Sequence, residues 1–207
     1  MRTRVKICGF TQVQDAVEAA ILGVDAIGLV FYPPSPRNIS IDKAIEITKA
    51  LPAFVTTVAL FVDEQEARIR EVLTKVPIDC IQFHGDESAD ACRIYNKPYI
   101  KAIRMKPELD VMALAEEYDD ASALLLDAYH PGIKGGSGSK FDWDLIPNNC
   151  CLPVILAGGL QVDNAMQAVQ FVKPYALDVS SGVESSKGIK DVAKMAAFIQ
   201  VTKEGDR

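Results

Sequence analysis

Short apolar runs alternate with longer amphipathic stretches along the whole chain. This alternation is typical of parallel strands joined by crossover helices, and it predicts eight such units. The expected strands are Arg4–Cys8, Ala26–Val30, Thr56–Phe61, Cys80–Phe83, Ile100–Ile103, Ala123–Asp127, Val154–Ala157 and Ala176–Val179. Several of these runs are apolar at every position, as expected of strands that are covered on both faces.

Residues that favour helix starts stand before most of the amphipathic stretches. Thr11 with Gln14 predicts a capping box, in which the two side chains satisfy free N–H groups of the first turn. Ser40 and Asp63 predict the starts of the next two helices. Later helices are expected after Asp86, Pro107, Phe141, Asp163 and Gly188.

Eight units at a spacing of roughly 25 residues favour an α/β fold of one kind, the closed (β/α)₈ or TIM barrel. An open flavodoxin-like or Rossmann sheet is the alternative, but it would leave some units without a place. Because no linker or change of composition divides the chain, we expect residues 1–207 to form a single barrel domain.

Composition and charge exclude several classes of function. The chain has 207 residues and is 49% apolar, its net charge is −6, and its acidic and basic residues are interspersed. Without a basic patch, nucleic acid is not an expected partner. The N-terminus leads directly into the first strand without a long apolar stretch, so we expect a cytoplasmic protein with no membrane partner.

The cysteines and histidines do not form a recognisable metal or disulfide pattern. Five cysteines without a C-x-x-C pair and only two histidines argue against a zinc site, so neither disulfides nor a metal need be invoked. The cysteines are Cys8, Cys80, Cys92, Cys150 and Cys151, and the histidines are His84 and His130.

Two reactive side chains end predicted strands, where a barrel places its active site. Cys8 closes the first strand and precedes Gly9, a position in which a thiol can act as a base or nucleophile. A buried structural cysteine is the alternative. Asp127 closes an apolar strand, where a charge is costly unless it faces a cleft or a partner. A helix cap or a salt bridge would also explain it.

Glycine-rich turns follow the seventh and eighth strands, the two places where barrels bind phosphate groups. Glycine lets backbone N–H groups converge on an anion. Tight turns need glycine in any case, which is the structural alternative. The candidate phosphate-binding residues are Gly158, Gly159, Ser180, Ser181 and Gly182.

Three further features belong to loops. Three prolines stiffen the loop after the second strand and position Arg37, whose planar fork can hold a carboxylate; an ordinary surface arginine is the alternative. His84 follows the fourth strand as an accessory substrate-binding residue, either a neutral scaffold or an acid–base group. The glycine-rich segment 128–140 predicts a lid that closes over substrate, or an ordinary loop.

Seven segments together resemble one known family, the phosphoribosylanthranilate isomerases of tryptophan biosynthesis. The likeness spans nearly the whole chain in the right order. The segments are Lys6–Thr11, Phe31–Arg37, Gln82–Gly85, Leu126–Asp127, Gly135–Gly138 with Phe141–Trp143, Ala157–Leu160 and Asp178–Glu184.

The resemblance implies a (β/α)₈ barrel that isomerises N-(5-phosphoribosyl)anthranilate to 1-(2-carboxyphenylamino)-1-deoxyribulose 5-phosphate, an Amadori rearrangement without a cofactor. By the family's pattern Cys8 matches the general base, Asp127 the general acid and Arg37 the arginine that meets the anthranilate carboxylate. The phosphate would lie on the loops of Gly159 and Ser181–Gly182.

Two alternatives remain at this point. The histidine-pathway isomerase family acts on a phosphoribosyl-aminoimidazole. In that family's pattern both catalytic residues are aspartates, so the thiol of Cys8 argues against it. A non-catalytic phosphoribosyl-binding barrel would be expected to lose Cys8 or Asp127. The sequence leaves the oligomeric state open between monomer and homodimer.

Overall fold

Eight parallel strands form a closed barrel in which each strand pairs with the next in sequence and the last pairs with the first. The computed structural model describes residues 2–106, 108–128, 143–147 and 149–206. The barrel strands are β1 (Arg4–Cys8), β2 (Ala26–Val30), β3 (Thr56–Phe61), β4 (Cys80–Phe83), β5 (Tyr99–Met105), β6 (Ala123–Ala128), β7 (Val154–Leu156) and β8 (Ala176–Val179).

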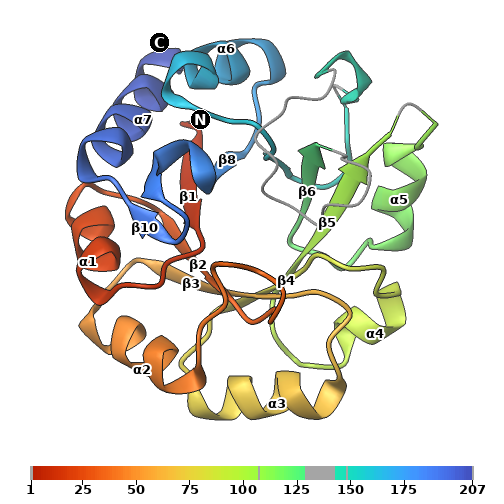
Figure 1. Cartoon of the computed structure of the whole chain (residues 1–207). Coiled ribbons are helices and arrows are strands. Elements are labelled where there is room, and N and C mark those ends of the chain that lie inside the picture. The colour runs from red at the N-terminus through yellow and green to blue at the C-terminus, as the bar shows by residue number, and fades with distance from the viewer. Residues whose placement is uncertain (1, 107, 129–142, 148, 207) are drawn as a thin grey trace.

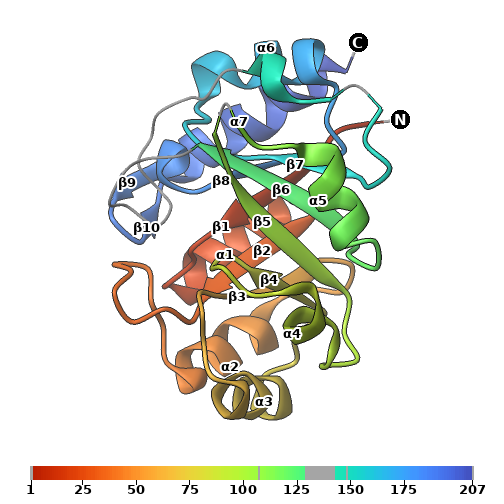
Figure 2. The same cartoon turned by 90° about the vertical axis from the view of Figure 1, so that its right-hand side faces the viewer.

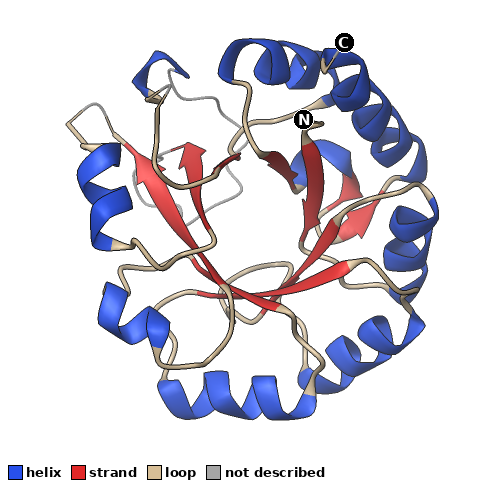
Figure 3. Ribbon diagram, turned by 180° about the vertical axis from the view of Figure 1, so that it is seen from behind, coloured by secondary structure: helices blue, strands red, loops and turns tan. Residues whose placement is uncertain are grey.

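Helices surround the barrel as an outer ring (Figure 1 and Figure 3). They are α1 (Val13–Ile21), α2 (Ile41–Ala50), α3 (Glu66–Lys75), α4 (Ala89–Arg93), α5 (Val111–Glu117), α6 (Val162–Val172) and α7 (Val192–Gly205), with 3₁₀ turns η1 (Trp143–Leu145) and η2 (Ser181–Val183). None of the helices in the described part of the chain has the length and apolar character needed to cross a bilayer.

Alternation along the strands separates the outer core from the barrel interior. In β1, Val5 and Ile7 join the large apolar cluster that includes the helices, whereas Cys8 joins a small cluster at the barrel mouth. A separate apolar layer fills the interior of the barrel below that mouth. Its members are Val58, Cys80, Ile100, Ala102, Ala123, Leu125, Ile155, Ala157 and Ala176. The charged side chains at the barrel mouth therefore lie above an apolar layer.

The predicted closed barrel is confirmed, and all eight expected strands are present. Only their ends differ. β5 begins at Tyr99 and ends at Met105, β6 continues to Ala128 and β7 ends at Leu156. These shifts leave the candidate residues at the carboxyl ends of their strands.

The helix starts were predicted less well. Ser40 does cap α2, because its hydroxyl accepts a hydrogen bond from the backbone N–H of Lys43 at 3.1 Å. The capping box at Thr11 is wrong: Gln12 occupies the N-cap position of α1, and the Thr11 hydroxyl donates to the carbonyl of Gly188 at 2.6 Å. Asp63 is not a cap either, since Gln65 precedes α3.

The connections after β6 and β8 also differ from the prediction. Of the link between β6 and β7, the described part contains η1 in place of the expected helix, while Phe141 and the predicted lid, apart from Ala128, lie outside the described residues. After β8 comes an unpredicted antiparallel hairpin of β9 (Glu184–Ser186) and β10 (Ile189–Lys190). Figure 2 shows this hairpin at the end of the barrel opposite the N-terminus.

Candidate active site

A cavity of about 780 Å³, part of it open to solvent, lies at the carboxyl ends of the barrel strands. Eight of the predicted site residues line it: Cys8, Arg37, His84, Asp127, Gly158, Gly159, Ser180 and Ser181. Gly182 is not among the lining residues. A Cβ at that position would lie 2.0 Å from the carbonyl oxygen of Leu160, so Gly182 allows η2 to approach the turn after β7.

Cys8 is more buried than a strand-end thiol was expected to be, with 6% of its surface exposed. Gly28 of β2 provides the space for its sulfur, because a Cβ on Gly28 would lie 2.6 Å from Sγ. Burial raises the pKa of the Cys8 thiol, while the ammonium groups of Lys6 and Lys190 act in the opposite direction. The sulfur still faces the same cavity as Asp127.

A buried ion pair lies directly below Cys8. Lys6 precedes Cys8 by two residues on the same face of β1, and its Nζ is 2.9 Å from Oδ1 of Asp178 on β8. Burial raises the pKa of Asp178, with Lys6 opposing the shift and the charge of Asp127 adding to it. The carboxyl of Asp178 also lines the cavity.

Asp127 is buried and has an imidazole as its neighbour. Nε2 of His84 lies 3.2 Å from Oδ2 of Asp127, within ion-pair distance but without hydrogen-bond geometry among the described residues. Gln82 Nε2 lies 3.3 Å from the other ring nitrogen, and Arg104 Nη2 donates to the His84 carbonyl at 2.7 Å. The His84 ring is therefore fixed from its backbone and from one nitrogen, with Nε2 directed to the carboxyl.

The turn after β7 has the backbone shape that an anion site needs. Gly158 and Gly159 both have positive φ angles, 82° and 65°, which two successive residues with side chains would rarely adopt. The amide of Asn164 donates to the Gly159 carbonyl at 2.9 Å and fixes the turn to α6. Next to it, the Ser180 hydroxyl donates to the Cys8 carbonyl at 3.0 Å, which joins the second turn to β1.

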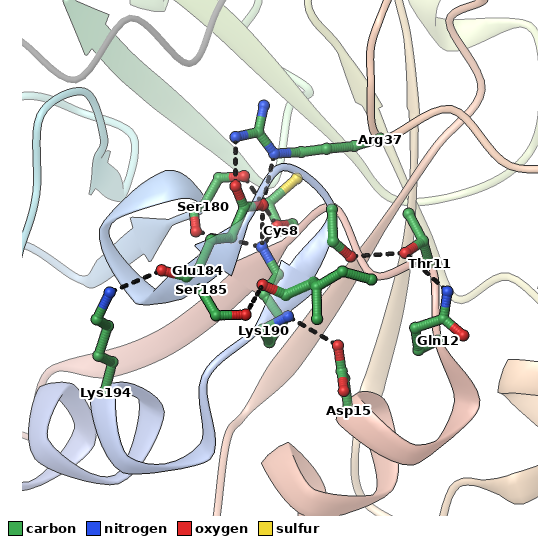
Figure 4. Close-up of polar contacts among 12 residues, drawn as sticks. Cys8, Thr11, Gln12, Asp15, Arg37, Ser180, Glu184, Ser185, Lys190 and Lys194 are labelled. Atoms are coloured by element: carbon green, nitrogen blue, oxygen red, sulfur yellow. Dashed lines mark hydrogen bonds and ion pairs between the residues drawn. The ribbon is translucent and has the colours of Figure 1, made fainter.

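Arg37 reaches the cavity with its guanidinium already engaged (Figure 4). Its Nε and Nη2 each donate to a carboxylate oxygen of Glu184 at 2.7 Å. Its aliphatic part crosses Gly9, where a Cβ would lie 2.4 Å from Cδ. Burial works against ionisation of Glu184, but Arg37 and Lys190 hold its pKa below the usual range.

Four charged residues at this end of the barrel were not predicted as site residues. Lys6 and Asp178 each lie within an apolar strand, the same signal that singled out Asp127, so the sequence could have indicated them. Glu184 ends the segment Asp178–Glu184 that resembles the family but was given no role, and Lys190 lies on a hairpin strand that the sequence pattern did not reveal.

The thiols and acidic groups do not suggest a metal centre. Cys8, Cys80, Cys92, Cys150 and Cys151 are all free cysteines. Within the described ranges, no group of three or more His, Cys, Asp or Glu side chains could hold a metal ion.

Comparison with known proteins gives a consistent result. The protein-family model of N-(5'-phosphoribosyl)anthranilate (PRA) isomerase matches residues 5–201. The N-(5'-phosphoribosyl)anthranilate isomerase of Nitrosococcus oceani is 56% identical over 200 residues, which cover 97% of each chain.

Two crystal structures are similar in fold and sequence. The phosphoribosyl anthranilate isomerase of Thermotoga maritima has a TM-score of 0.89 and 38% identity, covering 98% of this chain and 99% of its own. A phosphoribosyl anthranilate isomerase in complex with reduced 1-(o-carboxyphenylamino)-1-deoxyribulose 5-phosphate has a TM-score of 0.87 and 37% identity, with the same coverage. The chain therefore belongs to the family of N-(5'-phosphoribosyl)anthranilate isomerases.

Proposed function

We propose that this isomerase converts N-(5-phosphoribosyl)anthranilate to 1-(2-carboxyphenylamino)-1-deoxyribulose 5-phosphate, with Cys8 as general base and Asp127 as general acid. The observation that carries the proposal is that both side chains line one cavity, next to the glycine-rich turn of Gly158 and Gly159. The related structure that holds a reduced form of this product supports the choice of substrate.

The reaction divides into two proton transfers. Asp127 in its protonated form donates to the ring oxygen of the ribose while the bond from C1 to that oxygen breaks, which leaves an iminium between C1 and nitrogen. Cys8 as thiolate then takes the proton from C2, and the electrons of that bond form an enolamine. Loss of the C2 hydroxyl proton and protonation at C1 give the ketone. Oxidation at C2 balances reduction at C1, so the step needs no cofactor.

The surroundings of each group suit its proposed role. Lys6 and Lys190 supply positive charge toward Cys8, which favours the thiolate that burial disfavours. His84 faces Asp127 at 3.2 Å and is the neighbour best placed to stabilise its carboxylate after proton transfer. The phosphate would be held by backbone N–H groups of the Gly158–Gly159 and Ser180–Ser181 turns, and the anthranilate carboxylate by Arg37.

The proposal extends to the compartment, the domain organisation and the oligomeric state of the enzyme. The cytoplasm keeps thiols reduced and so protects a base that acts as a free thiolate, and we place the enzyme there. We expect residues 1–207 to act as one catalytic domain. Acidic helices of mixed charge suit a monomer, and a homodimer through loop surfaces is the other arrangement to test.

The test is a fluorescence assay that follows the loss of freshly made phosphoribosylanthranilate. We expect Cys8→Ala and Asp127→Asn each to lower kcat by about 10²- to 10⁴-fold, because both groups act in the transition state. Binding of the reduced product analogue should change little. Cys151→Ala, which removes an exposed thiol, is the matched control and should retain the parental rate.

Two outcomes would contradict the proposal. Near-parental turnover by Cys8→Ala would remove the thiol as base. Turnover of the phosphoribosyl-aminoimidazole substrate in place of phosphoribosylanthranilate would assign the chain to the histidine-pathway reaction.

A further inference from the structure

The hairpin β9–β10 places two buried charges against the active site. The side chains of Glu184 and Lys190 are 5% and 0% exposed, and their Oε1 and Nζ atoms lie 2.9 Å apart. Glu184 also receives the two hydrogen bonds from Arg37. Lys190 Nζ also donates to the carbonyl oxygens of Cys8 at 2.6 Å and Ser180 at 3.2 Å. Figure 4 shows Arg37, Glu184 and Lys190 joined by these contacts to one another and to Cys8 and Ser180.

We infer that Glu184 and Lys190 are positioning residues of this enzyme: Glu184 fixes the guanidinium of Arg37 for the anthranilate carboxylate, and Lys190 fixes the end of β1 that carries the base Cys8. The inference rests on the proposed function, in which Arg37 binds substrate and Cys8 removes a proton. The inference adds two residues that affect the reaction through Arg37 and Cys8 and are not themselves in contact with the substrate.

The geometry at Arg37 determines which edge of its guanidinium is free. A guanidinium has five N–H donors, and Glu184 takes one on Nε and one on Nη2. The three N–H groups that remain, two on Nη1 and one on Nη2, are then available to a second carboxylate. The arginine stem crosses Gly9 at a point where no Cβ would fit, and Glu184 holds its guanidinium end.

The geometry at Cys8 involves the main chain. The Cys8 carbonyl receives hydrogen bonds from both Lys190 Nζ and the Ser180 hydroxyl, so the last residue of β1 is held from the hairpin and from the end of β8. The same ammonium group is one of the two that favour the thiolate of Cys8. One side chain therefore fixes the position of the sulfur and contributes to its charge.

Stability alone is a poor explanation for this arrangement. Burying an ion pair costs desolvation energy that its attraction barely repays, and an apolar pair of similar volume often serves as well. An apolar pair could not hold a guanidinium or two carbonyl oxygens. The charges are therefore better explained by the groups that they orient.

The first experiment is a mutant cycle between Glu184 and Arg37, with steady-state kinetics on phosphoribosylanthranilate. We expect Glu184→Gln to raise KM about tenfold and to change kcat less than threefold, because Arg37 contributes to ground-state binding. Arg37→Ala should raise KM at least as much. If Glu184 acts through Arg37, the double variant should be no worse than Arg37→Ala alone.

The mutant cycle needs a control variant at a residue that contacts Glu184 without contacting its carboxylate. Lys194→Met is the matched control, because the Lys194 ammonium donates to the main-chain oxygen of Glu184, at 2.8 Å, and its loss should leave KM and kcat unchanged. A KM for Glu184→Gln within twofold of the parent, or effects of the two single variants that multiply in the double variant, would overturn the role of Glu184.

The second experiment is the pH profile of inactivation by iodoacetamide for Lys190 variants. Only the thiolate is alkylated, so the inactivation rate rises with pH as Cys8 ionises, and loss of the Lys190 charge should move this rising limb to higher pH, by about one unit. Lys190→Met should show the shift, whereas Lys190→Arg should keep the parental midpoint. The charged groups that face Cys8 from the packed elements and remain in both variants are Lys6, Arg37, Asp127, Asp178 and Glu184.

A rising limb that stays in place in Lys190→Met would overturn the role of Lys190. The charge-neutral double variant Glu184→Gln/Lys190→Met guards against a failure to fold, and it should show both the raised KM and the shifted limb. Turnover by the parental enzyme distinguishes failure of the proposed function from failure of the inference about Glu184 and Lys190. If it does not turn over phosphoribosylanthranilate, the proposed function fails; if it does and the variants match it, only the inference fails.

Discussion

At the scale of single residues, the active site depends on side chains that are absent as much as on those that are present. Gly28 leaves space for the sulfur of Cys8, and Gly9 leaves space for the stem of Arg37. In both places a methyl group would come closer to a reactive residue than van der Waals contact allows. The two glycines therefore help to set the positions of the Cys8 thiol and of the Arg37 guanidinium.

We predict that Gly28→Ala lowers kcat by about 10²-fold, because the new methyl group would lie 2.6 Å from Sγ and force the thiol away from its position. Binding of the reduced product analogue, measured by calorimetry, should change little. Gly23→Ala is the control: its Cβ would meet its nearest neighbour at 4.0 Å, so it should affect stability and not kcat. Equal losses of kcat in the two variants would count against this explanation.

At the scale of elements, the hydrogen bonds at helix starts show how local signals work. Ser40 accepts from the N–H of Lys43, and Ser88 accepts from the N–H of Ala91. Each bond satisfies a donor that the first turn of a helix leaves free. Such caps are short-range features, and a serine before an amphipathic stretch can reveal them.

We predict that Ser40→Ala lowers the free energy of unfolding by about 1 kcal/mol, because α2 loses its N-cap. Urea denaturation followed by circular dichroism measures this change, and kcat should remain at the parental value. Ser122→Ala, at an exposed serine in the loop before β6, is the control and should change stability by less than about 0.5 kcal/mol. A Ser40→Ala variant as stable as its control would remove the cap as a contributor.

Strands and helix starts differ in how far the sequence could predict them. Barrel strands are long enough for apolar runs to indicate them, and turn residues mark their ends. Thr11 has the chemistry of a cap, but its hydroxyl bonds to Gly188, 177 residues away, and a local rule cannot detect that partner. The strands β9 and β10 are shorter than any periodic signal, so Glu184 and Lys190 were missed.

At the scale of the whole molecule, buried thiols make folding sensitive to alkaline pH. Burial raises the pKa of Cys80, inside the barrel, from 9.0 to about 11. The unfolded chain loses this proton near pH 9, whereas the folded chain keeps it. The stability that this protonated thiol contributes is therefore fully present below pH 9 and is lost as pH rises from 9 through 11.

We predict that Cys80→Ala reduces the fall of unfolding free energy between pH 9 and 11 by about 1.4 kcal/mol per pH unit. Denaturant titrations at several pH values measure the slope, and the slope is independent of the cavity that the substitution leaves. Cys151→Ala, at an exposed thiol, should keep the parental slope. Identical slopes for the parent and for Cys80→Ala would show that this thiol does not ionise on unfolding.

The hydrogen bond from Lys190 to the carbonyl of Cys8 joins residues that are 182 positions apart. Ribosomes therefore make the base of the proposed reaction long before the residue that supports it. A nascent chain halted before β8 lacks both the strand that closes the barrel onto β1 and the hairpin beyond it. On the roles proposed for these residues, chemistry waits until synthesis has passed Lys190, and a chain truncated before Lys190 should be inactive.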